Sequence, residues 1–344
     1  MGHYSTALTL KKELENKNID AEVIDFYEYI FPKARNIIYG AFNFLVSKFS
    51  SIYNFFYQIS SNTNVTPLKR IIDKKLEVLF ESKELEIVVS TFPVCSNYVS
   101  LYKKSRNKNI KLYTYITDID VNKEWITEET DMYFVGSKIT KKQLENYDVN
   151  SEKIKVVGIP VKQEFKKNLY SKCKNEILIM GGGLGLLPNI DKIIKELISN
   201  KNIHVTLIAG KNKKLFYKYN EKYNKKYNNL SVVGYTNEVY KYMEKAEIII
   251  TKAGGITLFE AINSQTPIYV ISPFLYQEVG NAMYIEKEGI GIINWNDNES
   301  VATDIINLLN YPMKLERMKR NMRKITNNLE NTNILNTYLE EKIC

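Results

Sequence analysis

Short runs of β-branched residues alternate with helical patterns along almost the whole chain. This alternation is typical of βαβ units, in which helices cover both faces of a parallel sheet. We therefore predict an α/β fold, with helices beginning near Thr6, Thr66 and Ile139 and a helical tail from about Val301. The predicted strands span residues 21–26, 86–91, 111–117, 132–136, 155–158, 176–180, 204–209, 231–234, 247–251 and 267–271.

The length of the chain predicts two domains, because 344 residues exceed what a single hydrophobic core usually supports. An extended Gly-Ile-Pro segment gives way to a lysine-rich stretch between residues 158 and 175. We place the boundary there, with a first domain over residues 1–165 and a second, which includes the helical tail, over 166–344.

The charge balance favours anionic partners. With 48 Lys and Arg against 39 Asp and Glu, the net charge is +9, which suits nucleic acid, phospholipid headgroups or a sugar diphosphate. The cysteines Cys95, Cys173 and Cys344 have no CxxC spacing, which argues against a zinc site or a disulfide framework and fits a reducing cytoplasm. The chain has neither an uncharged apolar run of about 18 residues nor a signal-peptide pattern.

A glycine-rich turn follows the strand predicted over 176–180. It contains Gly181, Gly182, Gly183 and Gly185 and leads into a helical pattern. Glycines at a strand-to-helix turn let the backbone approach a phosphate, which the free amides of the helix start attract. A tight turn without a ligand is the alternative, because such patterns are weak evidence alone.

A second turn of this kind follows the strand predicted over 247–251. Gly254 and Gly255 precede a helix in which Thr257 and nearby amides could hold a phosphate. Glu260, about one turn into that helix, could accept hydrogen bonds from a sugar diol. The alternative for Glu260 is an acidic first-turn residue that the helix dipole favours.

Polar residues also cluster after the strand predicted over 267–271. They are Gln277, Glu278 and Asn281. At the carboxyl end of a parallel strand such groups can bind ligand hydroxyls, and otherwise they form a solvated loop.

Residues 251–261 and 277–281 together resemble the donor-site signature of the family of monogalactosyldiacylglycerol synthases and processive diacylglycerol glucosyltransferases. This family is related to the enzyme that completes lipid II. Segments 114–120, 158–161 and 181–185 match the family in the same order. The resemblance implies a GT-B fold, in which two Rossmann-like lobes face each other across a cleft. It also implies that the C-terminal lobe holds a UDP-sugar, with no other cofactor and no obligatory metal.

The resemblance implies a contact for each part of the donor. Glu260 would hold the ribose, and Gln277 with Glu278 would hold the hexose hydroxyls. Thr257 and the glycine turns would hold the diphosphate.

Three further positions also receive roles from the family. The segment around Gly234 and Tyr235 would hold the uracil. Lys162 would lie beside the cleft, where a cation could steady the leaving diphosphate.

The family places a histidine in the acceptor half of the cleft as the base for the acceptor hydroxyl, and His3 matches it. A histidine near its ordinary pKa suits that role, and Asp118 is the alternative base. Disorder is the ordinary expectation for a residue so close to a chain end. Trp125 belongs to the expected acceptor site, but Asn122 and Thr127 stand where the family tends to carry histidines, so we expect the acceptor pocket to differ.

Family members usually begin with a hydrophobic strand and a glycine-rich turn that ends in Gly-His. This sequence begins with Met1, Gly2 and His3. We therefore expect either a start further upstream or a first lobe that lacks its first strand.

Residues 30–59 are rich in aromatic side chains, have basic flanks and contain no acidic residue. Such a segment could lie among lipid headgroups and admit a lipid acceptor, and its candidate contacts are Phe42, Phe49, Phe55 and Phe56. The alternative is a helix pair packed on its own lobe. No RNA-binding signature accompanies the basic residues, so nucleic acid is not expected as a partner.

From these residues and the resemblance we expect an inverting transfer of a hexose from a UDP-sugar to a lipid hydroxyl, with diacylglycerol as the favoured acceptor. The enzyme would act in the cytoplasm, peripherally on the inner face of the cell membrane. One rival is a GT-B transferase for another acceptor, such as a polyprenyl-linked sugar or a small metabolite. A second rival is a non-catalytic subunit that binds sugar nucleotides.

Overall fold

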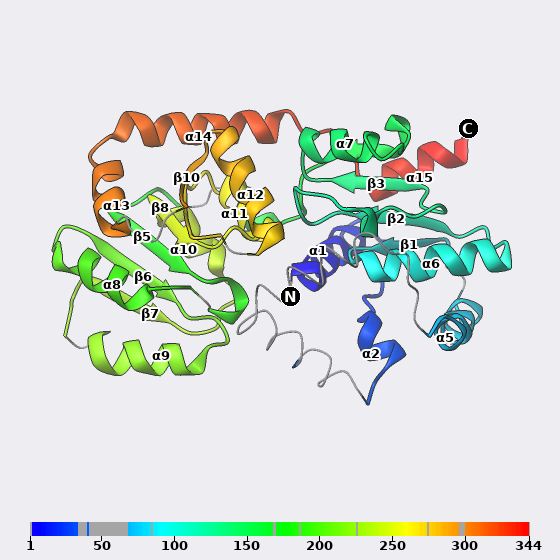
Figure 1. Cartoon of the computed structure of the whole chain (residues 1–344), viewed down its shortest axis with the longest axis horizontal. Coiled ribbons are helices and arrows are strands. Elements are labelled where there is room, and N and C mark those ends of the chain that lie inside the picture. Colours follow the sequence, from blue (N-terminus) through cyan, green and yellow to red (C-terminus); the bar gives the residue numbers. More distant parts are fainter. Residues whose placement is uncertain are drawn as a thin grey trace. The chain divides into compact units, whose positions relative to one another are not determined.

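The computed structural model describes residues 2–33, 40, 68–83, 85–167, 170–185, 187–224, 226–273, 275–295 and 300–343. The chain forms two compact units (Figure 1). The first comprises Met1–Pro160 together with Leu329–Cys344, and the second comprises Val161–Asn328. Both are parallel sheets with helices, so the predicted α/β class is confirmed.

The first unit contains a parallel sheet with the strand order β1-β2-β3-β4. Its strands are β1 (Ile87–Ser90), β2 (Lys111–Tyr115), β3 (Met132–Val135) and β4 (Ile154–Val156). Its helices are α1 (Gly2–Glu15), α2 (Phe26–Ile30), α5 (Lys69–Glu81), α6 (Pro93–Arg106), α7 (Lys138–Glu145) and α15 (Ile334–Ile343), with short turns η1 (Lys123–Trp125) and η2 (Ser151–Lys153).

Strand β3 illustrates why this sheet is covered on both faces. All four of its residues are buried, and successive side chains point to opposite faces. Phe134 packs with Leu10 of α1 and Ile334 of α15, whereas Tyr133 packs in a separate cluster with Leu144 of α7. A continuous apolar run therefore forms a strand buried on both sides, as in α/β proteins generally.

The second unit contains a six-stranded parallel sheet with the order β10-β9-β8-β5-β6-β7. Its strands are β5 (Glu176–Met180), β6 (His204–Ile208), β7 (Leu230–Val233), β8 (Ile248–Thr251), β9 (Ile268–Ile271) and β10 (Gly291–Asn294). Its helices are α8 (Ile190–Ser199), α9 (Lys213–Tyr219), α10 (Val239–Lys245), α11 (Gly255–Asn263), α12 (Tyr276–Lys287), α13 (Val301–Leu309) and α14 (Pro312–Asn327), with short turns η3 (Gln163–Lys166), η4 (Gly182–Leu184) and η5 (Asn220–Asn224).

The order of these strands reverses beside β5. From β5 the chain proceeds through β6 to β7 on one side, and then returns to β8 and continues to β10 on the other side. Loops that leave β5 and β8 diverge at such a point and open a crevice at the carboxyl edge of the sheet, where α/β proteins bind ligands. The two predicted glycine-rich turns follow these two strands.

Every predicted strand is present except the one over 21–26, and β10 was not predicted. Residues 21–25 pair with no strand among the described residues, and helix α2 begins at Phe26. The Asp25 side chain caps that helix by accepting from the Glu28 amide at 3.1 Å. The β-branched segment does not form a strand, because no neighbouring strand provides the hydrogen bonds that a strand needs. The helix begins at Phe26 instead.

The end of the chain belongs to the first unit, not to the second domain expected over 166–344. The Glu330 amide donates to the Val156 carbonyl at 2.8 Å, and the Val156 amide donates to the Glu330 carboxylate at 2.8 Å. Ile334 is buried against the first sheet. The boundary between the units falls after Pro160, slightly before the expected position.

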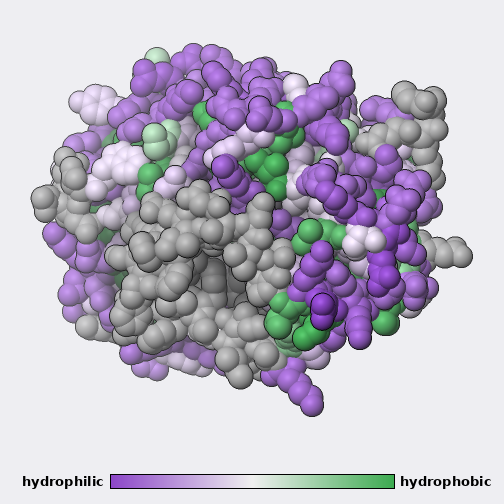
Figure 2. Space-filling view, turned by 45° about the vertical axis from the view of Figure 1, so that its right-hand side comes forward, coloured by the Kyte–Doolittle hydropathy of each residue, from purple (hydrophilic) through white to green (hydrophobic). Residues whose placement is uncertain are grey.

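The predicted membrane contacts Phe42, Phe49, Phe55 and Phe56 lie outside the described residues. Among the described helices, none is long and apolar enough to cross a membrane. The coloured surface in Figure 2 is mostly hydrophilic, with small hydrophobic areas.

Candidate active site

The turn after β5 crosses closely over the turn after β6. A Cβ atom on Gly185 would lie 2.2 Å from the Ala209 carbonyl oxygen, and one on Gly210 would lie 2.8 Å from the Gly183 oxygen. The Lys211 amide donates to that Gly183 oxygen at 3.0 Å. Gly185 is therefore required by packing, which fits the tight-turn alternative for this one residue.

Gly182 occupies a different environment in the same turn. Its φ of +66° lies in the left-handed region, and a Cβ there would stand 3.4 Å from the Lys252 Cε atom. The turn after β5 and the turn after β8 thus meet at the strand-order reversal, where Lys252 lies beside Gly182.

Helix α11 begins directly after β8 with an open N-terminus. Gly254 is its N-cap, no side chain among the described residues caps it, and a Cβ on Gly254 would meet nothing within 4 Å. The first amides of a helix, here those of Gly255 to Thr257, have no intrahelical acceptor. Together with the helix dipole they form an anion-binding position.

Glu260 lies on α11 beside the predicted cation Lys162. Burial raises the pKa of the Glu260 carboxyl to about 7, and the Lys162 charge partly opposes that rise. Lys162 precedes η3, which contacts α11, and its Nζ donates to the Asn237 carbonyl at 3.1 Å. The fold thus brings Lys162 and Glu260, almost 100 residues apart in sequence, to the same edge of the sheet.

Glu278 forms an ion pair that the sequence did not predict. Its carboxylate is 2% exposed, and Lys252 Nζ lies 3.0 Å from its Oε1 atom. The other oxygen, Oε2, is buried and has no hydrogen-bond partner among the described residues. A buried acceptor without a donor suits a sugar hydroxyl, which would supply the missing hydrogen bond. Lys252 lies within the family signature over residues 251–261, so that signature could have marked it as a candidate.

Asn281 links two elements of the candidate site. It is 1% exposed, and its Nδ2 donates to the Ala253 carbonyl at 2.9 Å, which ties α12 to the turn after β8. Gln277 lies in the first turn of α12 and is partly buried. The structure therefore gives Asn281 a positioning role and leaves Gln277 accessible.

Gly234 and Tyr235 follow β7, the edge strand of the same sheet. The Tyr235 ring is 59% exposed, its hydroxyl donates to Asn237 Oδ1 at 3.1 Å, and Lys211 Nζ lies 5.5 Å from its centroid. A Cβ on Gly234 would make only ordinary contact with Phe216, so packing does not demand glycine there. An exposed ring at this edge could stack on a planar base.

In the first unit His3 lies at the carboxyl edge of the sheet instead of at a frayed end. Its Nδ1 is 2.9 Å from Thr117 Oγ1, and its carbonyl accepts from the Thr91 hydroxyl at 2.9 Å. Its ring lies 5.2 Å from Phe92 and 5.9 Å from the buried Trp125. Burial lowers the pKa of His3 to about 4, so the imidazole is neutral at pH 7.

The hydrogen bond at Nδ1 orients His3 for the role of a base, although its pKa of about 4 lies below the ordinary value that we expected for that role. Thr117 engages Nδ1, which leaves Nε2 as the nitrogen available to an acceptor hydroxyl. Asp118 follows Thr117 directly and is partly buried on the same edge. Among the described residues, no group of three or more His, Cys, Asp and Glu side chains is arranged to hold a metal ion.

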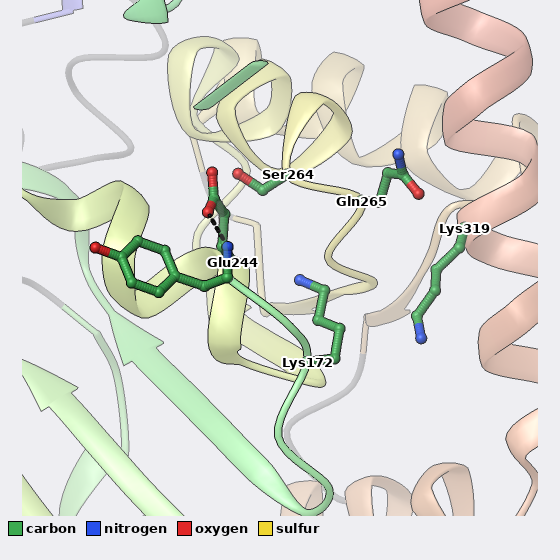
Figure 3. Close-up of a pocket in the computed structure, with 6 residues that line it drawn as sticks. Lys172, Glu244, Ser264, Gln265 and Lys319 are labelled. Atoms are coloured by element: carbon green, nitrogen blue, oxygen red, sulfur yellow. Dashed lines mark hydrogen bonds between the residues drawn. The ribbon is translucent and has the colours of Figure 1, made fainter. Parts of the chain in front are cut away.

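A cavity of about 240 Å³ lies at the opposite, amino-terminal edge of the second sheet (Figure 3). None of the predicted donor residues lines it, so it is not the predicted site. Lys172 points into it from the segment before β5, and its Nζ donates to the Met243 carbonyl at 3.0 Å. The other lining residues are Tyr170, Glu244, Ser264, Gln265 and Lys319.

Comparison with known proteins covers both units. Residues 3–161 match the family described as monogalactosyldiacylglycerol (MGDG) synthase, and residues 176–333 match the glycosyltransferase family 28 C-terminal domain. A processive diacylglycerol beta-glucosyltransferase of Bacillus thuringiensis (strain Al Hakam) is 30% identical over 99% of this chain and 91% of its own length. The chain belongs to the MGDG synthase family. A second relative of the same description, from Bacillus cereus (strain G9842), is 31% identical over 94% of this chain and 87% of its own length.

Solved structures of low sequence identity agree on the fold of this MGDG synthase family member. Acinetobacter baumannii MurG superposes with a TM-score of 0.57 and 12% identity, covering 96% of this chain and 92% of that chain. The glycotransferase of kitacinnamycin has the same TM-score and 12% identity, with coverage of 75% and 77%. The predicted GT-B fold is thereby confirmed. The family 28 C-terminal domain and the curated relatives show that the chain is a glycosyltransferase.

Proposed function

We propose that the chain transfers glucose from UDP-glucose to the free hydroxyl of diacylglycerol, with inversion at the anomeric carbon. The observation that carries this proposal is the match over nearly the full length to relatives described as processive diacylglycerol beta-glucosyltransferases. A β-linked product from a UDP-α-sugar requires inversion, which a single displacement provides.

The donor half of the reaction is assigned to the second unit. The open N-terminus of α11, with Thr257 in its first turn, would bind the diphosphate. Glu260 would accept from the ribose hydroxyls, and the unpaired oxygen of Glu278 would accept from the hexose. The exposed Tyr235 ring would stack on the uracil. Backbone amides and lysine side chains would compensate the negative charge of the diphosphate, so the proposal includes no obligatory metal.

The acceptor half is assigned to the first unit. The acceptor hydroxyl gives its proton to His3 Nε2 while its oxygen forms a bond to the anomeric carbon. The bond from that carbon to the phosphate oxygen breaks, and UDP leaves with the bonding electrons. Lys162 and the amides of α11 would stabilise the charge that develops on the leaving diphosphate.

The proposal places the enzyme in the cytoplasm, peripherally on the inner face of the membrane. A diacylglycerol acceptor is confined to a bilayer, and the chain has a net charge of +9 that favours anionic headgroups. The aromatic segment over 30–59 remains a predicted contact.

Incubation of the protein with diacylglycerol and labelled UDP-glucose, with UDP-galactose in parallel, tests the proposal. We expect a glucolipid on thin-layer chromatography. A galactolipid as the preferred product would contradict the assigned sugar, and transfer only to a polyprenyl-linked sugar would contradict the assigned acceptor.

A further inference from the structure

Helix α14 (Pro312–Asn327) presents a strongly basic face to solvent. Six of its side chains are basic, and Glu316 is its one acidic residue. The helix lies along the outside of the second unit, against α11 and α13 (Figure 1). Its apolar side chains Leu315, Met318 and Met322 are buried, so its inner face is committed to the core of that unit.

Four of the six basic side chains share one outward stripe. They are Lys314, Arg317, Arg320 and Lys324, and all four are exposed. At 3.6 residues per turn they fall within an arc of about 120° that borders the buried face at Lys314 and otherwise points away from it. None of the four forms a hydrogen bond or an ion pair within the part of the chain that the structure describes. The other two are engaged, since Lys319 pairs with Glu316 at 2.7 Å and Arg323 donates to Gln265 at 2.6 Å.

Exposed apolar side chains accompany this stripe. Met313 is 78% exposed and Tyr311 is 66% exposed, the two highest values for large hydrophobic side chains among the described residues. Met313 falls within the same arc as the four cations. Leaving both side chains in water has no benefit for the folded chain, whereas a lipid interface accepts a methionine and a tyrosine beside basic residues.

We propose that the stripe Lys314, Arg317, Arg320 and Lys324, with Met313 and Tyr311, docks the second unit onto an anionic membrane surface. The cations meet lipid phosphates, and the two apolar side chains enter the headgroup layer. This contact involves residues other than those of the aromatic segment over 30–59. We choose a membrane over another polyanion because of the proposed lipid acceptor. The basic stripe itself is observed independently of that proposal.

The test is sedimentation of the full chain with vesicles made of equal parts phosphatidylglycerol and phosphatidylcholine. A variant with Gln at all four stripe positions should lose at least about tenfold in vesicle affinity, because each basic residue near an anionic surface contributes substantially. A charge-matched control replaces four exposed lysines elsewhere in the same unit, Lys192, Lys195, Lys201 and Lys214, with Gln. That control should bind nearly as well as the wild type.

Three further measurements sharpen the result. Met313→Ser should weaken the binding that persists at high salt, where the charge contribution is screened. Transfer to detergent-dispersed diacylglycerol should be unchanged in the stripe variant, so that a failed docking surface and a failed transferase are distinguished. Equal losses in the stripe variant and its control would overturn the proposal. Displacement from vesicles by a single-stranded oligonucleotide, with no effect of the stripe variant on binding to lipid, would also overturn it.

Discussion

Under the proposed function, Glu260 should make donor binding depend on pH. Its carboxyl is buried enough to have a pKa of about 7, and only its ionised form is a full acceptor for two ribose hydroxyls. The affinity for UDP-glucose should therefore rise as the pH increases from 6 to 8. Glu260→Gln should bind more weakly and show a flatter response to pH in calorimetric titrations.

Glu260→Ala should weaken UDP-glucose binding by about 1.5 to 3 kcal/mol, the range for a hydrogen bond to a charged group. The exposed Glu221→Ala is a matched control that should bind as the wild type does. Unchanged affinity in a folded Glu260→Ala protein would remove this residue from the site.

Lys252 keeps the buried Glu278 carboxylate paired. Lys252→Met would leave that charge without its counter-ion, so the KM for UDP-glucose should rise by roughly tenfold or more at neutral pH. Lys252→Arg should restore most of the loss, because it keeps the charge. Steady-state kinetics of the two variants measure this, and an unchanged KM in Lys252→Met would show that the pair does not serve the donor.

His3→Ala should lower turnover by about two to four orders of magnitude, the usual share of general base catalysis, and leave UDP-glucose affinity nearly unchanged. Because burial lowers the pKa of His3 to about 4, the wild type should keep a deprotonated base down to that pH. The control is His204→Ala, which removes the other histidine, hydrogen-bonded to Ser231 in the second sheet. Full turnover in His3→Ala would show that His3 is not the base and would make Asp118 the next candidate.

Sequence patterns predict candidate site residues that lie beside a strand end and a helix start. Glu260 and the glycines are such residues, because the spacing of strand, glycine and helix fixes their place. The ion pair of Lys252 with Glu278 was not predicted, because Glu278 lies on a different helix and only the fold brings the two together. The packing requirement for Gly185 depends likewise on the neighbouring turn after β6.

At the level of elements, the partly buried Lys172 fixes the segment that leads into β5. Burial lowers the pKa of Lys172 to about 7, so the unfolded chain binds more protons than the folded chain between about pH 7 and 10.5. Stability should therefore rise with pH in this range, by at most about 1.4 kcal/mol per pH unit. Lys172→Met should lack this increase.

Urea unfolding at pH 7 and pH 9 tests this expectation. In a Trp125→Phe background, the remaining Trp295 reports on the second unit alone. If the free energy of unfolding depends on pH equally in the wild type and in Lys172→Met, Lys172 is not the group responsible.

Five of the six strands of the second unit, β5 to β9, were predicted within about a residue, because apolar runs between turn signals mark strands buried on both faces. The strand expected over 21–26 was wrong, since pairing depends on a neighbour that a local pattern cannot supply. The apolar positions of α15 predict that one face of this helix is packed. They cannot predict that it packs on the first sheet, because that depends on the fold.

At the scale of the whole molecule, each unit supplies one half of the proposed chemistry. The second unit carries an open helix start and two carboxylates at a strand-order reversal, and the first carries a neutral histidine beside Trp125. The α/β class and the family were predictable because their motifs occur in a fixed order along the sequence. The placement of the last helix with the first unit was not, since it depends on contacts between distant segments.

Formation of a glucolipid from UDP-glucose and diacylglycerol is the most direct test of the central claim. We predict a β-linked glucosyldiacylglycerol, with one UDP released for each glucose transferred, and strongly reduced formation by the His3→Ala and Glu260→Ala proteins. Release of UDP without a lipid product, or a product with an α-linkage, would contradict the account.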